Sequence, residues 1–260
     1  MGFFKRLITP AGEEAFVDGC RELSQGSYAA AIRHLQNATH LTDGLFLAGF
    51  LHLKNGNTDH AIPLLQQAVR DHRRLGRYFR KYSLALTLSL PVTEEIAAHV
   101  GPTLRGVLLA LVEAHQIAAN WSEAYDCLLR LRKLEPDDVV ILLSLVELLW
   151  QANEGDEETH RHIVKLTKGV KNETPVHTTL LLYKARVLSS LGMHTAARDI
   201  LTKTLRRKKE RSDELMLALR YDRALAYLAL GHEKRGRSDL EKIYAADPDF
   251  EDVAKRLQSA

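Results

Sequence analysis

Several features that would narrow the function of this chain are scarce in its sequence. Only two of the 260 residues are cysteine and seven are proline. No run of about eighteen consecutive apolar residues occurs that could span a bilayer. Runs of alternating β-branched and aromatic residues are also hard to find, whereas Leu, Ala, Glu, Lys and Arg are common. We therefore expect a globular all-α protein.

The two cysteines and the first residues bear on the compartment. Cys20 and Cys127 lie far apart within helical patterns, which favours two small core residues over a disulfide or a metal pair. The segment "MGFFKRLITPAGEEAF" has no apolar run of signal-peptide length. Both observations indicate a reducing compartment, and we expect the protein to be cytoplasmic.

A spaced set of small residues recurs along the chain. In most copies a glycine stands five positions before the small residue, and in every copy a leucine stands four positions after it. The small residues are Ala31, Ala61, Ala124, Ala197 and Gly236. They are separated by 30, 63, 73 and 39 residues. If each long gap hides one more copy, the mean repeat is about 34 residues, the length of a helix–turn–helix unit.

Each recurring residue has a physical reason within such a unit. The glycine ends the first helix in a conformation with positive φ, which carries no Cβ penalty for glycine. The small residue lets the second helix approach the first closely. Pro136 and Pro248 end the second helix in two copies. The pattern therefore predicts pairs of helices that hide their apolar faces against each other and against the next pair.

The pattern resembles the tetratricopeptide repeat. Units of that family carry a glycine in the first helix, an aromatic residue after the turn and a proline between units. Gly19 and Gly49 occupy the first-helix glycine, and Tyr28 and Trp121 occupy the aromatic position. The resemblance implies a right-handed α-solenoid of about seven antiparallel helix pairs with a C-terminal capping helix.

On this basis the chain divides into three parts. Residues 1–11 form an N-terminal amphipathic segment, residues 12–248 the repeat array, and residues 249–260 the polar capping helix that an open solenoid end needs. Two copies within the array are degenerate, near 77–101 and 137–172.

The two degenerate copies depart from the pattern differently. In the copy near 77–101, Pro91 stands at the expected turn, and Thr93 is expected to cap a second helix that Gly101 and Pro102 cut short. The copy of 137–172 has an acidic turn and lacks the small residue in its second helix. Both departures are expected to change the curvature of the array.

We find no pattern of residues that indicates catalysis. The segment "GPTLRG" lacks the lysine of a phosphate-binding loop and follows a predicted helix. His160 and His162 are two residues apart, which places them on different sides of a helix, so they cannot share a metal ion. We therefore expect no enzymatic activity, cofactor or metal site.

The resemblance also implies where a partner binds. In arrays of this kind the first helices line a concave groove that holds a peptide or an amphipathic helix. The residues at the matching positions here are Phe16, Phe46, Phe50, Glu113, Glu147, Trp150, Arg186 and Tyr221. Some relatives clamp a C-terminal carboxylate with Lys, Asn and Arg, but this chain has Phe16, Cys20 and Leu47 there. The sequence therefore indicates a protein-binding scaffold with a different kind of ligand.

Two basic clusters offer an alternative function. Segments 70–81 and 203–211 would allow association with nucleic acid through phosphate contacts. The residues that would bind a polyanion are Arg73, Arg74, Arg77, Arg206, Arg207 and Lys208. Both clusters can also be explained as solvated helix ends, where positively charged side chains interact favourably with the negative end of the helix dipole. We favour that explanation, so a nucleic-acid partner is not our expectation.

The N-terminal segment also allows two interpretations. Phe3, Phe4, Leu7 and Ile8 share one side of a short helix, and residues 3–8 could contact a membrane surface or a partner. We favour a lid that packs on the first repeat, because an open solenoid end exposes apolar surface. The sequence leaves the oligomeric state open.

Overall fold

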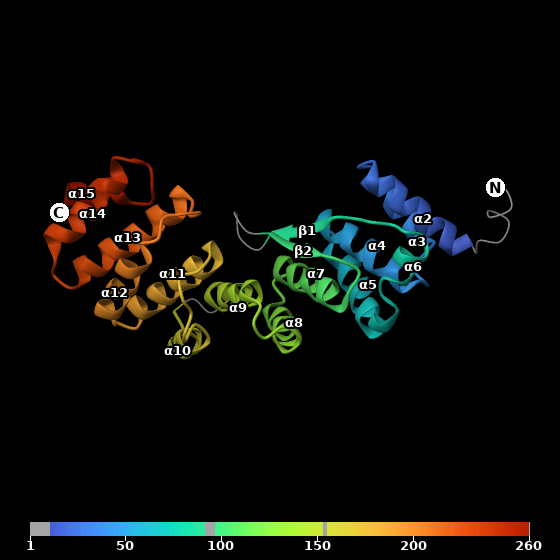
Figure 1. Cartoon of the computed structure of the whole chain (residues 1–260), viewed down its shortest axis with the longest axis horizontal. Helices are drawn as coiled ribbons and strands as arrows, with labels where there is room; N and C mark the ends of the chain where they lie inside the picture. The colour runs from blue at the N-terminus through green and yellow to red at the C-terminus, as the bar shows by residue number, and fades with distance from the viewer. Residues whose placement is uncertain (1–10, 92–96, 153–154, 260) are drawn as a thin grey trace. The chain divides into compact units, whose positions relative to one another are not determined.

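The computed structural model describes residues 11–91, 97–152 and 155–259 (Figure 1). The chain forms two compact units, Met1–Ile141 and Leu142–Ala260, which we describe separately. The predicted all-α class is confirmed: paired helices make up both units, and the only sheet among the described residues is one two-stranded hairpin. No helix in these ranges combines the length and hydrophobicity that crossing a bilayer requires.

The described residues of the first unit form three helix pairs, which follow one another as α2–α3, α4–α5 and α7–α8. Its elements are α2 (Ala11–Ser24), α3 (Tyr28–Gln36), α4 (Thr42–Lys54), α5 (Thr58–Arg70), η1 (His72–Arg74), α6 (Arg77–Lys81), β1 (Leu88–Pro91), β2 (Ala97–Val100), α7 (Leu104–Ile117) and α8 (Trp121–Leu134).

The pair α4–α5 shows how the recurring residues build a unit. Gly56 ends α4 with a φ of +73°, so the chain can turn back at once. Ala61 on α5 is completely buried. Gly49 on α4 faces it: an added Cβ there would lie 2.8 Å from Leu65 Cγ. The two helices can therefore approach closely only because Gly49 has no side chain.

The gap between the second and third copies contains an insertion instead of a hidden helix pair. Helix α5 packs directly on α7, so the stack continues although η1, α6 and the hairpin intervene in the sequence. The prediction of a second helix near 77–101 is wrong, because Ala97–Val100 is a strand. Its expected cap, Thr93, lies outside the described residues.

The hairpin forms because its apolar residues alternate. In the antiparallel register Leu88 lies opposite Val100, and Leu90 lies opposite Ala98. All four side chains are buried, and both strands contact α7 (Figure 1). A period of two places these residues on one face of a sheet, whereas a helix would scatter them around its axis.

Where the structure describes the second unit, it also shows three helix pairs. They are formed by α9 (Val139–Ala152), which begins three residues before the boundary, α10 (Glu157–Leu166), α11 (Pro175–Ser190), α12 (His194–Thr204), α13 (Asp213–Ala229) and α14 (Glu233–Tyr244), and α15 (Val253–Ser259) follows. The long gap between Ala124 and Ala197 thus does contain a further pair, α9–α10. The described residues form six pairs, one fewer than the seven expected.

Two apolar clusters hold most of the second unit together. The larger cluster joins α11, α12 and α13 through buried residues such as Leu188, Leu201 and Leu219. The smaller one joins α13 and α14 to Val253 of α15. Each helix pair therefore buries its apolar face against the next element along the chain.

Both cysteines are free and buried, as the sequence predicts. Burial raises the pKa of the Cys20 thiol to about 12 and that of the Cys127 thiol to about 11. Since the thiolate is the reactive form, neither residue is suited to nucleophilic or redox chemistry.

Candidate functional site

Three of the predicted groove residues lie in the core of the first unit. Phe16 and Phe46 have no exposed surface, and Phe50 is 3% exposed. A partner cannot reach these side chains without rearranging the unit. Their assignment to a binding groove is therefore corrected: they are core residues.

The insertion explains why this part of the first-helix face is closed. Helix α6 lies against α2 and α4. On the α2 side, the ring of Phe79 packs edge-on against Phe16 with 5.2 Å between ring centroids. The carboxylate of Asp43 on α4 accepts hydrogen bonds from the backbone N–H of Gly76 at 2.5 Å and of Tyr78 at 2.7 Å. A segment of the chain itself thus occupies the surface where a partner was expected.

A second buried carboxylate holds the other end of α6. Glu13 on α2 accepts hydrogen bonds from Lys81 and from the hydroxyl of Tyr82. These hydrogen bonds, the Lys81 one foremost, lower the pKa of Glu13. The residue therefore stays ionised, and α6 is fixed to the first helices at both of its ends.

Glu113 on α7 is the remaining predicted residue of the first unit. It is half-buried. Burial raises the pKa of its carboxyl, and the positive charge of Lys54 offsets part of that rise. The first unit therefore keeps one ionisable group of the predicted set partly accessible.

The second unit keeps its predicted residues partly exposed and brings several of them together. Glu147 and Trp150 lie on α9 and Arg186 lies on α11, each at intermediate exposure. The hydroxyl of Tyr183 donates a hydrogen bond to Glu147 Oε1 at 2.8 Å. Arg186 Nε donates to Asp222 Oδ2 on α13 at 2.7 Å. Polar contacts therefore run along the three first helices α9, α11 and α13.

Sequence reasoning missed Tyr183 and Asp222, although a signal for both exists. Each hydrogen bond joins residues 36 positions apart, which is close to the mean repeat of about 34 residues. A residue one repeat after a groove residue lies beside it on the next first helix. Advancing Glu147 and Arg186 by the mean repeat leads to Leu181 and Arg220, so the spacing indicates the neighbourhood of each partner and not the residue itself.

Burial sets the protonation behaviour of this surface. It raises the pKa of Glu147, and the hydrogen bond from Tyr183 offsets only part of that rise. It also raises the pKa of Asp222, against the nearby charge of Arg186. The Tyr183 hydroxyl has a raised pKa for the same reason. Burial therefore disfavours the ionised forms of Glu147 and Asp222, and each carboxylate accepts one hydrogen bond from a neighbouring helix of the unit.

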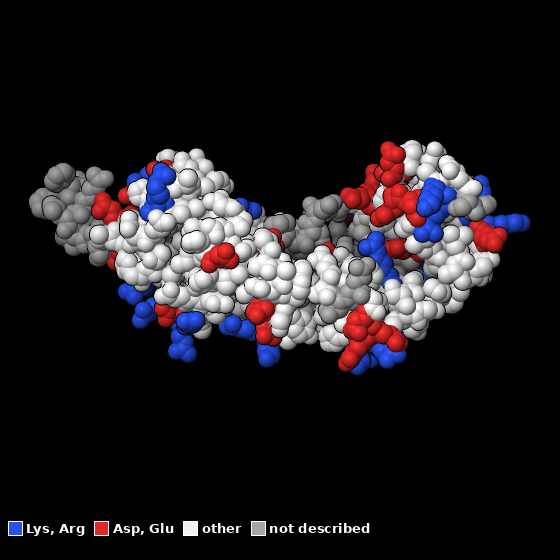
Figure 2. Space-filling model, turned by 180° about the vertical axis from the view of Figure 1, so that it is seen from behind, with Lys and Arg blue, Asp and Glu red and all other residues white. Residues whose placement is uncertain are grey.

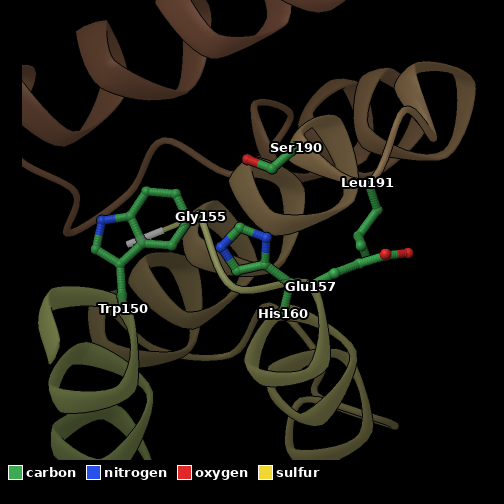
Figure 3. A pocket seen from close by; sticks show the side chains of 6 residues that line it. All are labelled: Trp150, Gly155, Glu157, His160, Ser190 and Leu191. Atoms are coloured by element: carbon green, nitrogen blue, oxygen red, sulfur yellow. The ribbon is translucent and has the colours of Figure 1, made fainter. Parts of the chain in front are cut away.

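A pocket of about 270 Å³ opens beside Trp150 (Figure 3). The indole of Trp150 stacks on the His160 ring at 5.6 Å with an interplanar angle of 21°, and the ring of Tyr183 meets it edge-on at 6.1 Å. Ser190, Leu191, Glu157 and Gly155 complete the lining. The pocket therefore offers an aromatic wall with a hydroxyl and a carboxylate at its rim.

Tyr221, the last predicted groove residue, supports the end of the unit. Its hydroxyl donates to Asp252 Oδ1 at 2.5 Å, and its ring meets Phe250 edge-on at 6.0 Å. Arg256 on α15 also donates to Asp252. Tyr221 therefore contacts residues at the end of the chain and not the groups around Glu147.

The residues predicted to bind a polyanion are divided between the two units, with Arg73, Arg74 and Arg77 in the first and the other three in the second. Arg73 and Arg74 are exposed in η1, and the guanidinium of Arg77 lies 5.8 Å from the Tyr78 ring centroid. On the face in Figure 2, Lys and Arg side chains form separate groups with Asp and Glu among them. A continuous basic track is absent from that face.

The second basic cluster is divided between two roles. Arg207 Nη1 donates to the Asn172 carbonyl at 2.9 Å, whereas Arg206 and Lys208 line another pocket. No group of three or more His, Cys, Asp and Glu side chains that could hold a metal ion occurs in the described ranges.

Comparison with known proteins identifies the fold. No family model and no curated protein matches the sequence. Among solved structures, the N-terminal domain of the EccA1 ATPase from the ESX-1 secretion system of Mycobacterium tuberculosis is 14% identical with a TM-score of 0.61, over 95% of this chain and 88% of that one.

Two further structures resemble the chain. BtubC from P. vanneervenii is 12% identical with a TM-score of 0.54, over 94% of each chain. The tetratricopeptide-like repeats of a putative kinesin light chain from Podospora anserina are 20% identical with a TM-score of 0.50, over 80% of this chain and 96% of that one. At these identities the likeness establishes the fold alone.

Proposed function

Because this chain has the fold of tetratricopeptide-repeat proteins, we propose that it is a non-enzymatic scaffold that binds a protein partner on the first-helix face of its second unit. The observation that carries the proposal is the group of partly exposed side chains on α9 and α11. It comprises Glu147, Trp150, Tyr183 and Arg186. In the first unit, α6 instead packs on Phe16 of α2 and is hydrogen-bonded to Asp43 of α4.

The chemistry of this face suits a protein segment. Trp, Tyr and Arg are the residues that most often carry the binding energy of protein interfaces. The pocket beside Trp150 can take an apolar side chain. The hydroxyl of Tyr183 donates its hydrogen bond to Oε1 of Glu147. The second carboxylate oxygen of Glu147 is therefore left for a donor from the partner. Consecutive first helices repeat such contacts every 8–10 Å or so. An amphipathic helix or an extended peptide matches that repetition.

The arrangement of charges supports binding over catalysis. Glu147 and Tyr183 pair with each other, and so do Arg186 and Asp222. An active site instead directs its titratable groups at a common point where a substrate sits. The two free, buried thiols suit a reducing compartment, so the cytoplasm is the location we propose.

The test compares two tryptophan variants of the tagged full chain in extracts of cells that express it. Trp150→Ala removes the aromatic wall of the pocket. Trp121→Ala is the matched control, because that side chain is 37% exposed at the start of α8 in the first unit. We expect a partner identified by mass spectrometry to be lost with Trp150→Ala and retained with Trp121→Ala.

A milder variant separates binding from folding. Tyr183→Phe removes the hydroxyl that binds Glu147 and keeps the ring that packs on Trp150. Circular dichroism of each variant shows whether the helices are intact. If folded Trp150→Ala and Tyr183→Phe capture the same partners as the wild type, the second-unit face is not the binding site and the proposal fails.

A further inference from the structure

A second pocket of the second unit lies between the end of α12 and the middle of α13. Its volume is about 290 Å³, far above the roughly 10–15 Å³ that a single water needs. The lining residues are Thr202, Leu205, Arg206, Lys208, Arg220 and Arg223. Four of these six side chains are cationic, and none is acidic.

Within the described part of the chain, one of the four cations has an acidic partner. Arg223 donates two hydrogen bonds of 2.8 Å to Asp239, and both side chains are largely buried. Across the described ranges, Arg206, Lys208 and Arg220 form no ion pair. Three uncompensated positive charges therefore border one pocket, which repel one another and favour an anion.

A buried hydroxyl in the same pocket lacks a partner. Thr202 Oγ1 is inaccessible to solvent and forms no hydrogen bond to any described residue. An unpaired buried polar group is unfavourable and calls for an explanation. Because Oγ1 is closed off from solvent in this rotamer, it can donate to a ligand oxygen in the pocket only after the Thr202 side chain turns.

The position of Arg220 distinguishes this pocket from an ordinary helix end. Arg206 and Lys208 follow the last residue of α12, Thr204, where cations suit the negative end of the helix dipole. Arg220 lies in the middle of α13, two turns from its start at Asp213. The dipole of α12 is equivalent to roughly half a negative charge, which three full positive charges outweigh.

We propose that this pocket binds a phosphate monoester carried by a phosphorylated side chain of a protein partner. A monoester carries a charge of about −1.5 to −2 and three acceptor oxygens at a single point. That matches cations grouped around one pocket. A nucleic-acid backbone instead spreads single charges along a track, whereas these cations border a single pocket.

Each cation has a distinct part in this binding. The planar guanidinium groups of Arg206 and Arg220 can each donate two parallel hydrogen bonds to phosphate oxygens. Lys208 adds a compact charge at the open side of the pocket, where it is exposed. Arg223 stays on Asp239 and holds the wall of the pocket in place. The inference rests on the proposed scaffold function only in assigning the phosphate to a protein.

The first experiment uses the full-length wild-type protein, calorimetry at low ionic strength, and inorganic phosphate as the probe. Because the cations are partly solvated, we expect a dissociation constant on the order of 1 mM that weakens as salt is added. The double variant Arg206→Ala/Lys208→Ala should bind about five- to tenfold more weakly. Lys209→Ala is the matched control, because that exposed lysine lies outside the pocket and should leave binding unchanged.

Two further arms identify the source of the phosphate. A short peptide with one phosphoserine should bind in the same way as inorganic phosphate, and its unphosphorylated form should not bind. Thr202→Val should weaken phosphate binding and leave the protein folded. Three results would each overturn the proposal. The first is failure of the wild-type protein to bind phosphate at about 20 mM, and the second is a loss of binding in Lys209→Ala as large as that in the double variant. The third is tighter binding of a 12-nucleotide oligomer than of the phosphopeptide. None of these readouts depends on the face around Trp150, so the proposed scaffold function is tested separately.

Discussion

Replacing Asp43 by alanine should detach α6 from the first-helix face of the first unit. Asp43 has no exposed surface and accepts the backbone hydrogen bonds of Gly76 and Tyr78 at the start of α6. These N–H groups have no acceptor within α6, because the first turn of a helix leaves its donors unsatisfied. In Asp43→Ala they would be unpaired for as long as α6 stayed in place, which favours its release.

The expected magnitude follows from these contacts. Each unsatisfied donor costs about 1–3 kcal/mol, which gives about 2–6 kcal/mol for two. The loss is reduced because burial raises the pKa of Asp43, so removing the carboxylate also removes the cost of a buried charge. We expect the free energy of unfolding to fall by about 2–4 kcal/mol. Asp43→Asn keeps one acceptor oxygen and should lose roughly half as much.

Urea unfolding followed by circular dichroism measures these losses, and hydrogen exchange locates them. Exchange of the Gly76 and Tyr78 amides should accelerate strongly in Asp43→Ala, because stability in stacked helix pairs is local. Asp59→Ala is the control, an exposed carboxylate in the first turn of α5, with an expected loss below about 1 kcal/mol. If Asp43→Ala loses no more stability than Asp59→Ala, Asp43 does not fix α6.

Three further predictions concern packing, charge and reactivity. Gly49→Val should lower the free energy of unfolding by about 1–3 kcal/mol, because the added side chain would overpack against α5. Gly101→Val is the control, since a side chain there meets open space. It should change the free energy of unfolding little when both variants are unfolded in urea. Burial raises the pKa of Glu147 above its ordinary value of 4.5, so ionisation weakens the folded state as pH rises through that raised pKa. Glu147→Gln, which keeps an acceptor for Tyr183, should therefore have a higher Tm than the wild type at pH 7 and an equal Tm near pH 4.5; a lower Tm at pH 7 would contradict the reasoning. The pKa of Cys127, raised to about 11 by burial, predicts negligible iodoacetamide labelling of the native protein and rapid labelling in urea, and equal labelling rates would refute it.

The repeat pattern predicted the helix pairs because their spacing follows from packing. A glycine turn and a small residue at a fixed distance are required wherever two helices cross closely, so Gly56 and Ala61 marked one pair in the sequence. The mean spacing could not show which long gap was filled by helices. The alternation in "LSL" and "AHV", at residues 88–90 and 98–100, was the local signal for a hairpin, and the expectation of a further repeat obscured it.

The candidate site was predictable only in part. The groove positions implied by the tetratricopeptide resemblance placed Glu147, Trp150 and Arg186 on first helices, where their side chains are partly exposed. The same rule failed for Phe16, because its exposure depends on whether a distant segment returns to cover it. That return is fixed by contacts such as the one between Phe16 and Phe79, which join residues far apart in sequence and leave no periodic signal.

The insertion also supplies the first-helix face of the first unit with an occupant from the same chain. Helix α6 is a resident occupant that is covalently tethered to the surface it fills, so its effective concentration there does not fall when the protein is diluted. Any outside competitor for α2 and α4 must outbind this tethered segment at every dilution. Opening this face of the first unit therefore requires the protein to give up the contacts of α6 with Asp43, Glu13 and Phe16 first.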